Sequence, residues 1–322
     1  MVRHDIFITN HQRQLLGSCK RWFCDGTFFI RPKGYAQVFS INGFLKAENG
    51  EITQVPLAFA FMKKRRSVDY IAIFEEIKGM LLSINIEEVV TDFERALFVA
   101  IRQCFPNVQH TGCSFHWKQA VLKTARKMGL IAAYRKKGPI RETIQRLLCL
   151  PYLPASKIQE VFNHLRNKSS PQLKKLFEYM ERNWIKNASW TIKNWSVYKR
   201  AIRTNNHCEG LHNRWNKKSK GRKNIYWILA CLVKEAKRID MTATLLCHGL
   251  MKQEVKRNTK MIQGKLFELW KNYEKKHFNS LTLLVDSVSL LKSNFPNLDS
   301  LGPIEEKDVY DDINDDACIP NS

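Results

Sequence analysis

At 322 residues the chain is long enough for about two domains with hydrophobic cores, and its 44% hydrophobic content excludes a fully disordered protein. The longest apolar runs, Val55–Met62 and Ile225–Val233, are far too short to cross a bilayer, which argues against a membrane protein. The nine cysteines follow no regular spacing, and the N-terminus does not look like a signal peptide, so we expect an intracellular, reducing compartment.

The net charge is unevenly distributed along the chain. The formal value is +23, but residues 303–322 hold seven acids and one lysine, so this tail carries −6 and residues 1–302 carry +29. A body with this charge predicts a polyanionic partner, most simply nucleic acid, because neutralising phosphates drives such binding. Solubility alone rarely requires so much charge of one sign.

Three strand-like segments come first in the chain. Trp22–Ile30 is apolar and aromatic apart from Asp25, Gly26 and Thr27, and Tyr35–Phe44 and Ile52–Met62 follow it. Glu48-Asn49-Gly50 is a strong turn signal between the last two. We therefore expect three strands before the first long helix.

Two helices and two short strands follow in alternation. Apolar residues at helical spacing after Ser67 predict a helix that Ser67 caps. Val89-Val90 predicts a strand, and Thr91 and Glu94 fit a capping box for a helix that Pro106 ends. Val108–Phe115 predicts a fifth strand. This order favours a mixed α/β layer structure.

From Gln119 onward the pattern becomes helical with basic faces, which predicts an all-α insertion, and helical patterning continues to about Asn294. The acidic tail is predicted to be disordered. The expected division is a first core segment (1–118), an all-α insertion (119–203), a return to the core (204–235), a C-terminal helical region (236–302) and the tail (303–322).

The segment Arg203–Asn213 reads as a capped helix with one acid in its first turn. On a helical wheel Glu209, His212 and Asn213 share a polar stripe, whereas Leu211 and Trp215 face the opposite side. The stripe is typical either of a solvent-exposed face or of a site to which Glu209 contributes a carboxylate.

Two upstream aspartates bear on that choice. Asp25 lies inside an apolar segment, although Asp-Gly is also a favoured hairpin turn, and Asp92 follows a strand, where a first-turn acid would also suit the helix dipole. If Asp25, Asp92 and Glu209 converge, their mutual repulsion favours hard cations such as Mg²⁺. Two such ions about 4 Å apart can catalyse phosphoryl transfer.

Four blocks around these acids stand in a fixed order: Trp22–Phe28, Thr91–Glu94, Gly112–His116 and Arg203–His212. Together they resemble the core blocks of Mutator-like element (MULE) transposases, over roughly residues 12–230. The resemblance implies an RNase H-like core with a DDE triad at Asp25, Asp92 and Glu209, interrupted by a helical insertion. It also implies a nuclear enzyme that uses two Mg²⁺ or Mn²⁺ ions to cut DNA at transposon ends and join the freed 3′ ends to target DNA.

The chain begins close to Asp25, whereas members of this family commonly carry an N-terminal zinc-finger-type domain that recognises the element's ends. We therefore expect DNA binding with little sequence preference. The alternative to a transposase is a nuclear host protein derived from one, which binds DNA and regulates without transposing. A homo-oligomer is compatible with either function.

Cys113 and His116 supply half of a tetrahedral zinc set, which His207, Cys208 or His212 would complete. The alternative is a buried cysteine beside a hydrogen-bonded histidine.

Basic runs are the remaining candidate binding residues. One follows Glu209 closely and could grip phosphates or act as a nuclear-import signal; its members are Lys217, Lys218, Lys220, Arg222 and Lys223. Lys63–Arg66 and 135–137 are two further runs. Trp184, Trp190 and Trp195 are expected to pack in a core, the alternative being base stacking.

Overall fold

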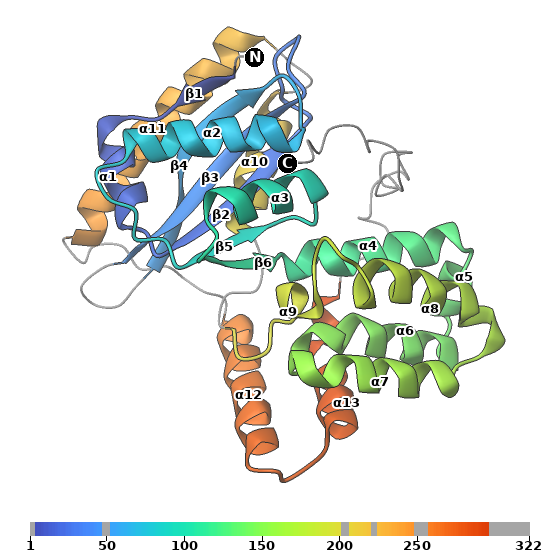
Figure 1. Ribbon diagram of the computed structural model, residues 1–322. Helices are drawn as coiled ribbons and strands as arrows, with labels where there is room; N and C mark the ends of the chain where they lie inside the picture. The colour runs from blue at the N-terminus through green and yellow to red at the C-terminus, as the bar shows by residue number, and fades with distance from the viewer. Residues whose placement is uncertain (1–3, 47–51, 201–205, 220–223, 248–256, 296–322) are drawn as a thin grey trace, which may run out of the picture.

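The computed structural model describes residues 4–46, 52–200, 206–219, 224–247 and 257–295, and places a six-stranded sheet beside a helical module (Figure 1). The sheet order is β1-β4-β3-β2-β5-β6. The strands are β1 (Asp5–Phe7), β2 (Arg21–Thr27), β3 (Gln37–Lys46), β4 (Ile52–Met62), β5 (Glu88–Thr91) and β6 (Gln109–Gly112). β2, β5 and β6 are parallel to one another, and the other pairings are antiparallel.

The three strands predicted before the first long helix are confirmed as β2, β3 and β4. Asp25 lies within β2 and pairs with Ser40 of β3, so the hairpin-turn interpretation of Asp25-Gly26 is wrong. The predicted turn Glu48-Asn49-Gly50 lies outside the described residues. The fifth predicted strand is shorter than expected: β6 ends at Gly112, and helix α4 (Ser114–Lys127) begins two residues later.

Both faces of the sheet are covered by helices (Figure 1). α2 (Ser67–Met80) and α3 (Arg95–Cys104) pack on the face that carries Trp22, Cys24 and Phe39. On the other face, α10 (Asn206–Ser219) and α11 (Ile225–Cys247) pack against Val38, Phe59 and Phe61. Since side chains alternate along a strand, Asp25 faces α10.

The capping box predicted at Thr91 and Glu94 is wrong. Glu94 is the N-cap residue of α3 but makes no side-chain capping bond. The hydroxyl of Thr91 donates to the Asp92 carbonyl at 2.8 Å, and the carboxylate of Glu94 pairs with Arg65. Both side chains are therefore engaged in contacts other than the predicted capping bonds.

The helical module has its own hydrophobic core. Its helices are α4, α5 (Ile131–Arg135), α6 (Pro139–Cys149), α7 (Ala155–Asn167), α8 (Lys174–Met180), α9 (Ile192–Trp195), α12 (Arg257–Glu274) and α13 (Ser280–Leu291). Trp270 of α12 is buried and donates to the Tyr152 carbonyl at 2.9 Å.

Two of the expected boundaries therefore differ from the structure: α4 crosses residue 119, and α11 crosses residue 236 along the sheet. The helices after α11 share the insertion's core because their apolar stripes pack against it.

Two N-terminal elements were not predicted: the edge strand β1 and helix α1 (Asn10–Ser18). β1 is only three residues long, too short for a periodic pattern. α1 has a sequence signal, because Thr9 and Gln12 form a capping box at its start.

The predicted mixed α/β class is confirmed, and the sheet with its covering helices is compatible with an RNase H-like core interrupted by a helical insertion. Within the described ranges, no helix is both long and apolar enough to span a membrane.

Candidate active site

Asp25 and Asp92 meet at the carboxyl end of two neighbouring parallel strands. Phe23 of β2 is level with Val90 of β5; Asp25 lies two residues further along β2, and Asp92 directly follows the end of β5. Asp25 is close enough to Asp92 for its negative charge to raise the pKa of the Asp92 carboxyl. The sheet topology thus brings two acids into one site, where each disfavours the charged form of the other.

Burial and the neighbouring charges set different protonation preferences for the two acids. Burial is the largest influence and raises the pKa of Asp92, and the negative charge of Asp25 adds to the rise. Burial also acts to raise the pKa of Asp25, but the positive charge and hydrogen bond of His212 lower it below its usual value. The charged form is therefore less favoured at Asp92 than at Asp25.

Helix α10 contributes His212 to this site. Its Nδ1 lies 3.1 Å from Asp25 Oδ2, and its Nε2 lies 3.3 Å from the hydroxyl of Ser40, which also approaches the Asp25 carbonyl. His212 is only 6% exposed, so the contact is internal to the protein. Ser40, a neutral residue in a predicted strand, gave no sequence signal for this positioning role.

The predicted helical wheel holds for Leu211 and Trp215, but the polar stripe divides, because His212 is buried and Asn213 is not. Leu211 and Trp215 are buried, and Trp215 stacks on Phe59 with ring centroids 5.4 Å apart. Asn213 is exposed, while His212 is directed at Asp25. The backbone of Glu209 belongs to α10, one helical turn before Asn213, but its side chain lies outside the described residues, as do those of His207 and Cys208.

His116 holds the other acid. Its Nδ1 lies 2.6 Å from Asp92 Oδ1. Burial acts to lower the pKa of His116, but Asp92 and a hydrogen bond with Cys113 raise it well above its usual value. Cys113 is fully buried, and its backbone N–H donates to the Thr91 carbonyl at 2.8 Å.

Cys113 and His116 do lie together, as the sequence predicted, and His116 contacts Asp92. In the described part of the chain, however, no three Cys, His, Asp or Glu side chains are grouped so that they could hold a metal ion. The described residues therefore favour the structural interpretation of Cys113 and His116, while zinc ligation that uses His207 or Cys208 stays a prediction.

The basic runs differ in their surroundings. Lys217 and Lys218 are exposed at the end of α10, whereas Lys220, Arg222 and Lys223 lie outside the described residues. Lys63–Arg66 is also exposed and follows β4 at the same end of the sheet as Asp25. This run was one of the candidate binding segments, and its Arg65 bonds Glu94 at 2.6 Å, two residues beyond Asp92.

The three tryptophans before α10 are core residues, as predicted. Trp184 and Trp195 are fully buried and Trp190 is 5% exposed. The base-stacking alternative is therefore wrong for this cluster.

The site therefore consists of two acids at adjacent strand ends of an α/β sheet, with the basic run Lys63–Arg66 at the same end of the sheet. The comparison with known families is more specific: residues 22–120 match the MULE transposase domain. This match confirms the resemblance for residues 22–120. No curated protein sequence matches the chain.

Proposed function

We propose that the protein is a DDE transposase that cleaves DNA at transposon ends and joins the 3′ ends to target DNA in the nucleus. The observation that carries this proposal is the convergence of Asp25 and Asp92 inside the matched domain. The backbone position of Glu209 on α10 supports it, because His212 of the same helix contacts Asp25.

The donor set fits Mg²⁺ or Mn²⁺. Two neighbouring carboxylates disfavour each other's charged form unless a cation lies between them, and hard cations prefer carboxylate oxygens. Asp25, Asp92 and Glu209 would hold the ions, which when bound would supply charge stabilisation at the scissile phosphate and activation of the attacking group. The attacking group would be water in cleavage and a DNA 3′-hydroxyl in joining.

The protein's own residues fix the positions of the acids. His116 orients Asp92, and His212, oriented in turn by Ser40, holds Asp25. Lys217 and Lys218 continue α10 beyond these contacts and would bind DNA phosphates, together with Lys220, Arg222 and Lys223.

The direct test is nicking of plasmid DNA with Mg²⁺, with Mn²⁺ and with EDTA. We expect cleavage only with the metals, and we expect Asp92→Asn to reduce it by about 100-fold or more, because several kcal/mol of charge stabilisation depends on this ligand. Asp286→Asn on α13, outside the site, is the matched control and should cleave normally.

The variants must also be compared by circular dichroism and melting temperature. Unchanged cleavage by a folded Asp92→Asn variant would refute the assignment. DNA binding by the unmodified protein without metal-dependent cleavage would instead favour the alternative, a transposase-derived regulatory protein.

A further inference from the structure

Two phenylalanines are exposed beside the acid pair. Phe28 and Phe29 are 42% and 50% exposed, and they follow Asp25 by three and four residues. Their neighbours Thr27 and Ile30 are buried, with Ile30 fully inside the cluster that contains Leu211 of α10. The loop is thus anchored on both sides, and exposure of the two rings is built into its conformation.

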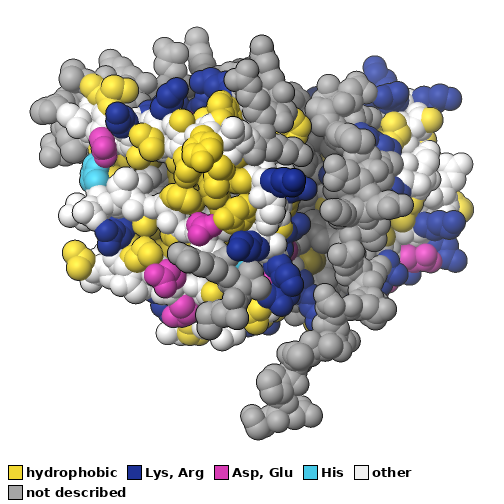
Figure 2. All heavy atoms as spheres, turned by 90° about the horizontal axis from the view of Figure 1, so that it is seen from above, with side chains coloured by type: hydrophobic (Ala, Val, Ile, Leu, Met, Phe, Trp, Pro, Cys, Tyr) yellow, Lys and Arg dark blue, Asp and Glu magenta, His cyan; other side chains and the backbone are white. Residues whose placement is uncertain are grey.

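The surroundings of these rings are cationic. The β2–β3 loop adds Arg31 and Lys33, and the β4–α2 loop adds Lys63–Arg66, while neither loop contains an acid. Both loops leave the same edge of the sheet, because Thr27 pairs with Val38 and Val38 pairs with Phe61. The view from above shows hydrophobic side chains gathered on this face, with Lys and Arg and also some Asp or Glu side chains around them (Figure 2).

One direct contact joins the two loops. The guanidinium carbon of Arg65 lies 4.6 Å from the centroid of the Phe28 ring. Glu94 holds the same guanidinium, and Tyr70 donates to Glu94 at 3.0 Å. Phe28 is therefore fixed by a cation–π contact that connects it to the segment following Asp92.

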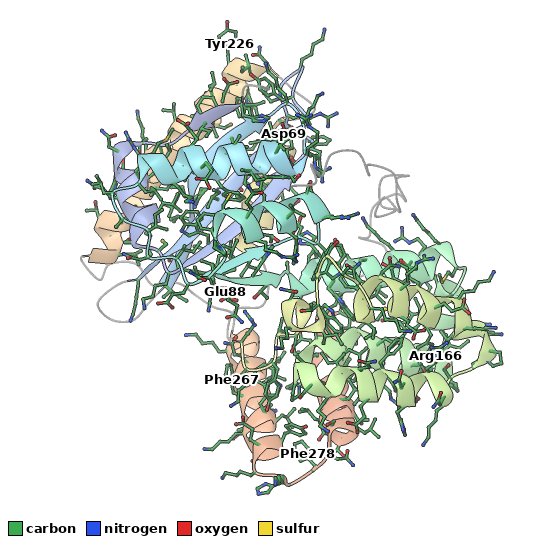
Figure 3. All side chains as sticks on the ribbon, viewed as in Figure 1. Asp69, Glu88, Arg166, Tyr226, Phe267 and Phe278 are labelled. Atoms are coloured by element: carbon green, nitrogen blue, oxygen red, sulfur yellow. The ribbon has the colours of Figure 1, made fainter. Side chains whose placement is uncertain are left out.

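The remaining acids on this side already have partners. Asp69, labelled in Figure 3 at this end of the sheet, pairs with Arg66 and His4, and Asp5 accepts from Tyr35. Within the residues that the structure describes, Lys33 and Lys64 are exposed and form no ion pair. The surface thus offers aromatic faces together with uncompensated positive charge.

This combination matches unpaired nucleotides. Aromatic rings stack on bases whatever their sequence, and lysine and arginine neutralise the adjoining phosphates. Phe28 follows Asp25 by three residues, which span at most about 10 Å, the length of about three nucleotides of a DNA strand. A base bound at Phe28 would then lie within about three nucleotides of a phosphate at the acids.

We propose that Phe28 and Phe29, backed by Arg65, form a stacking platform for one or two unpaired bases of the DNA strand next to the scissile phosphate. The proposal rests on the proposed function, since it places DNA at Asp25 and Asp92. It adds that the substrate bound at this site has locally opened base pairs.

The test measures binding without cleavage. The probe is a DNA duplex with a two-nucleotide single-stranded flap that contains 2-aminopurine, compared with the fully paired duplex, in buffer with EDTA. The unmodified protein should quench the 2-aminopurine and prefer the flap. The double variant Phe28→Ala, Phe29→Ala should lose the quenching and weaken flap binding by about 5- to 150-fold per stacked base, with duplex binding little changed.

Two control variants show whether the loss depends on an aromatic ring at this position. Phe267→Ala removes a phenylalanine of similar exposure, 38%, from α12 in the helical module (Figure 3) and should leave quenching intact. Phe28→Trp keeps an aromatic face and should retain it. Equal losses on flap and duplex, or no quenching by the unmodified protein, would overturn the platform.

The two proposals fail separately. Asp92→Asn should abolish nicking and retain quenching. If the protein quenches the probe but never nicks DNA with a metal, catalysis is refuted and the platform is not. If the double phenylalanine variant nicks opened and paired DNA as well as the unmodified protein does, the platform alone is refuted.

Discussion

Substitution of Gly112 by alanine should destabilise the protein through one identifiable clash. Gly112 ends β6, and a Cβ added there would lie less than 3.0 Å from three atoms of the Phe93 ring. The ring would have to retreat by roughly 1 Å to restore ordinary contact. It has no room to do so, because Trp184 and Trp190 lie 4.8 and 5.6 Å away, centroid to centroid.

Overpacking a core that cannot relax costs about 1–3 kcal/mol. We therefore expect Gly112→Ala to lower the free energy of unfolding by that amount, measured by urea denaturation, and the melting temperature by several degrees. Because Phe93 directly follows Asp92, nicking activity should fall as well. A double-mutant cycle with Phe93→Leu should show coupling of about 1 kcal/mol or more, since the smaller side chain relieves the clash.

Gly79→Ala in α2 is the matched control. A Cβ there meets no atom within 4 Å, so alanine should be neutral or stabilising by up to about 1 kcal/mol through its helix propensity. A neutral Gly112→Ala variant, or effects of Gly112→Ala and Phe93→Leu that simply add, would show that the packing around Phe93 is looser than this argument requires.

Two further predictions concern charge. Burial lowers the pKa of His110 to about 3, so between pH 6.5 and 3 the unfolded chain binds a proton that the folded chain does not. As the pH decreases through this range, the free energy of unfolding should decrease by up to about 1.4 kcal/mol per pH unit. His110→Asn, compared with the unmodified protein by urea denaturation at pH 7 and 5, should remove this part of the pH dependence, and an unchanged pH dependence would contradict the prediction. The double variant Lys217→Gln, Lys218→Gln should reduce the slope of log Kd for duplex DNA against log salt concentration by about two, measured by fluorescence anisotropy. The same change at Lys136 and Lys137 should reduce the slope less if DNA lies at the acids.

The central strands could be predicted because apolar residues recur along both of them. β3 and β4 are buried along nearly their whole length, and such runs favour strands whatever their partners. Asp25 was harder, because Asp-Gly fits both a turn and a strand. Pairing with Ser40, fifteen residues away, decides between them, and local sequence does not contain that information.

The positions of Asp25 and Asp92 were predictable, and the contacts that support them were less so. Asp92 could be placed because a strand end exposes polar groups. The hydroxyl of Thr91, by contrast, does not cap a helix but lies 2.8 Å from Nε2 of His110, a contact that the local sequence does not reveal. Likewise, an amphipathic pattern predicts α12 and α13 as helices without naming the surface they cover. Packing against the insertion is a tertiary choice that the pattern leaves open.

The two acids are held in place by hydrophobic anchors in the segments that follow them. Phe93, next to Asp92, is inserted among Trp184 and Trp190 of the helical module, and Ile30, five residues after Asp25, packs with Trp215 of α10. The cost of keeping two carboxyl groups together is therefore offset by aromatic packing on either side of them. This explains how the insertion, which supplies no predicted catalytic residue, helps to position the site: its tryptophans fix the backbone that carries Asp92.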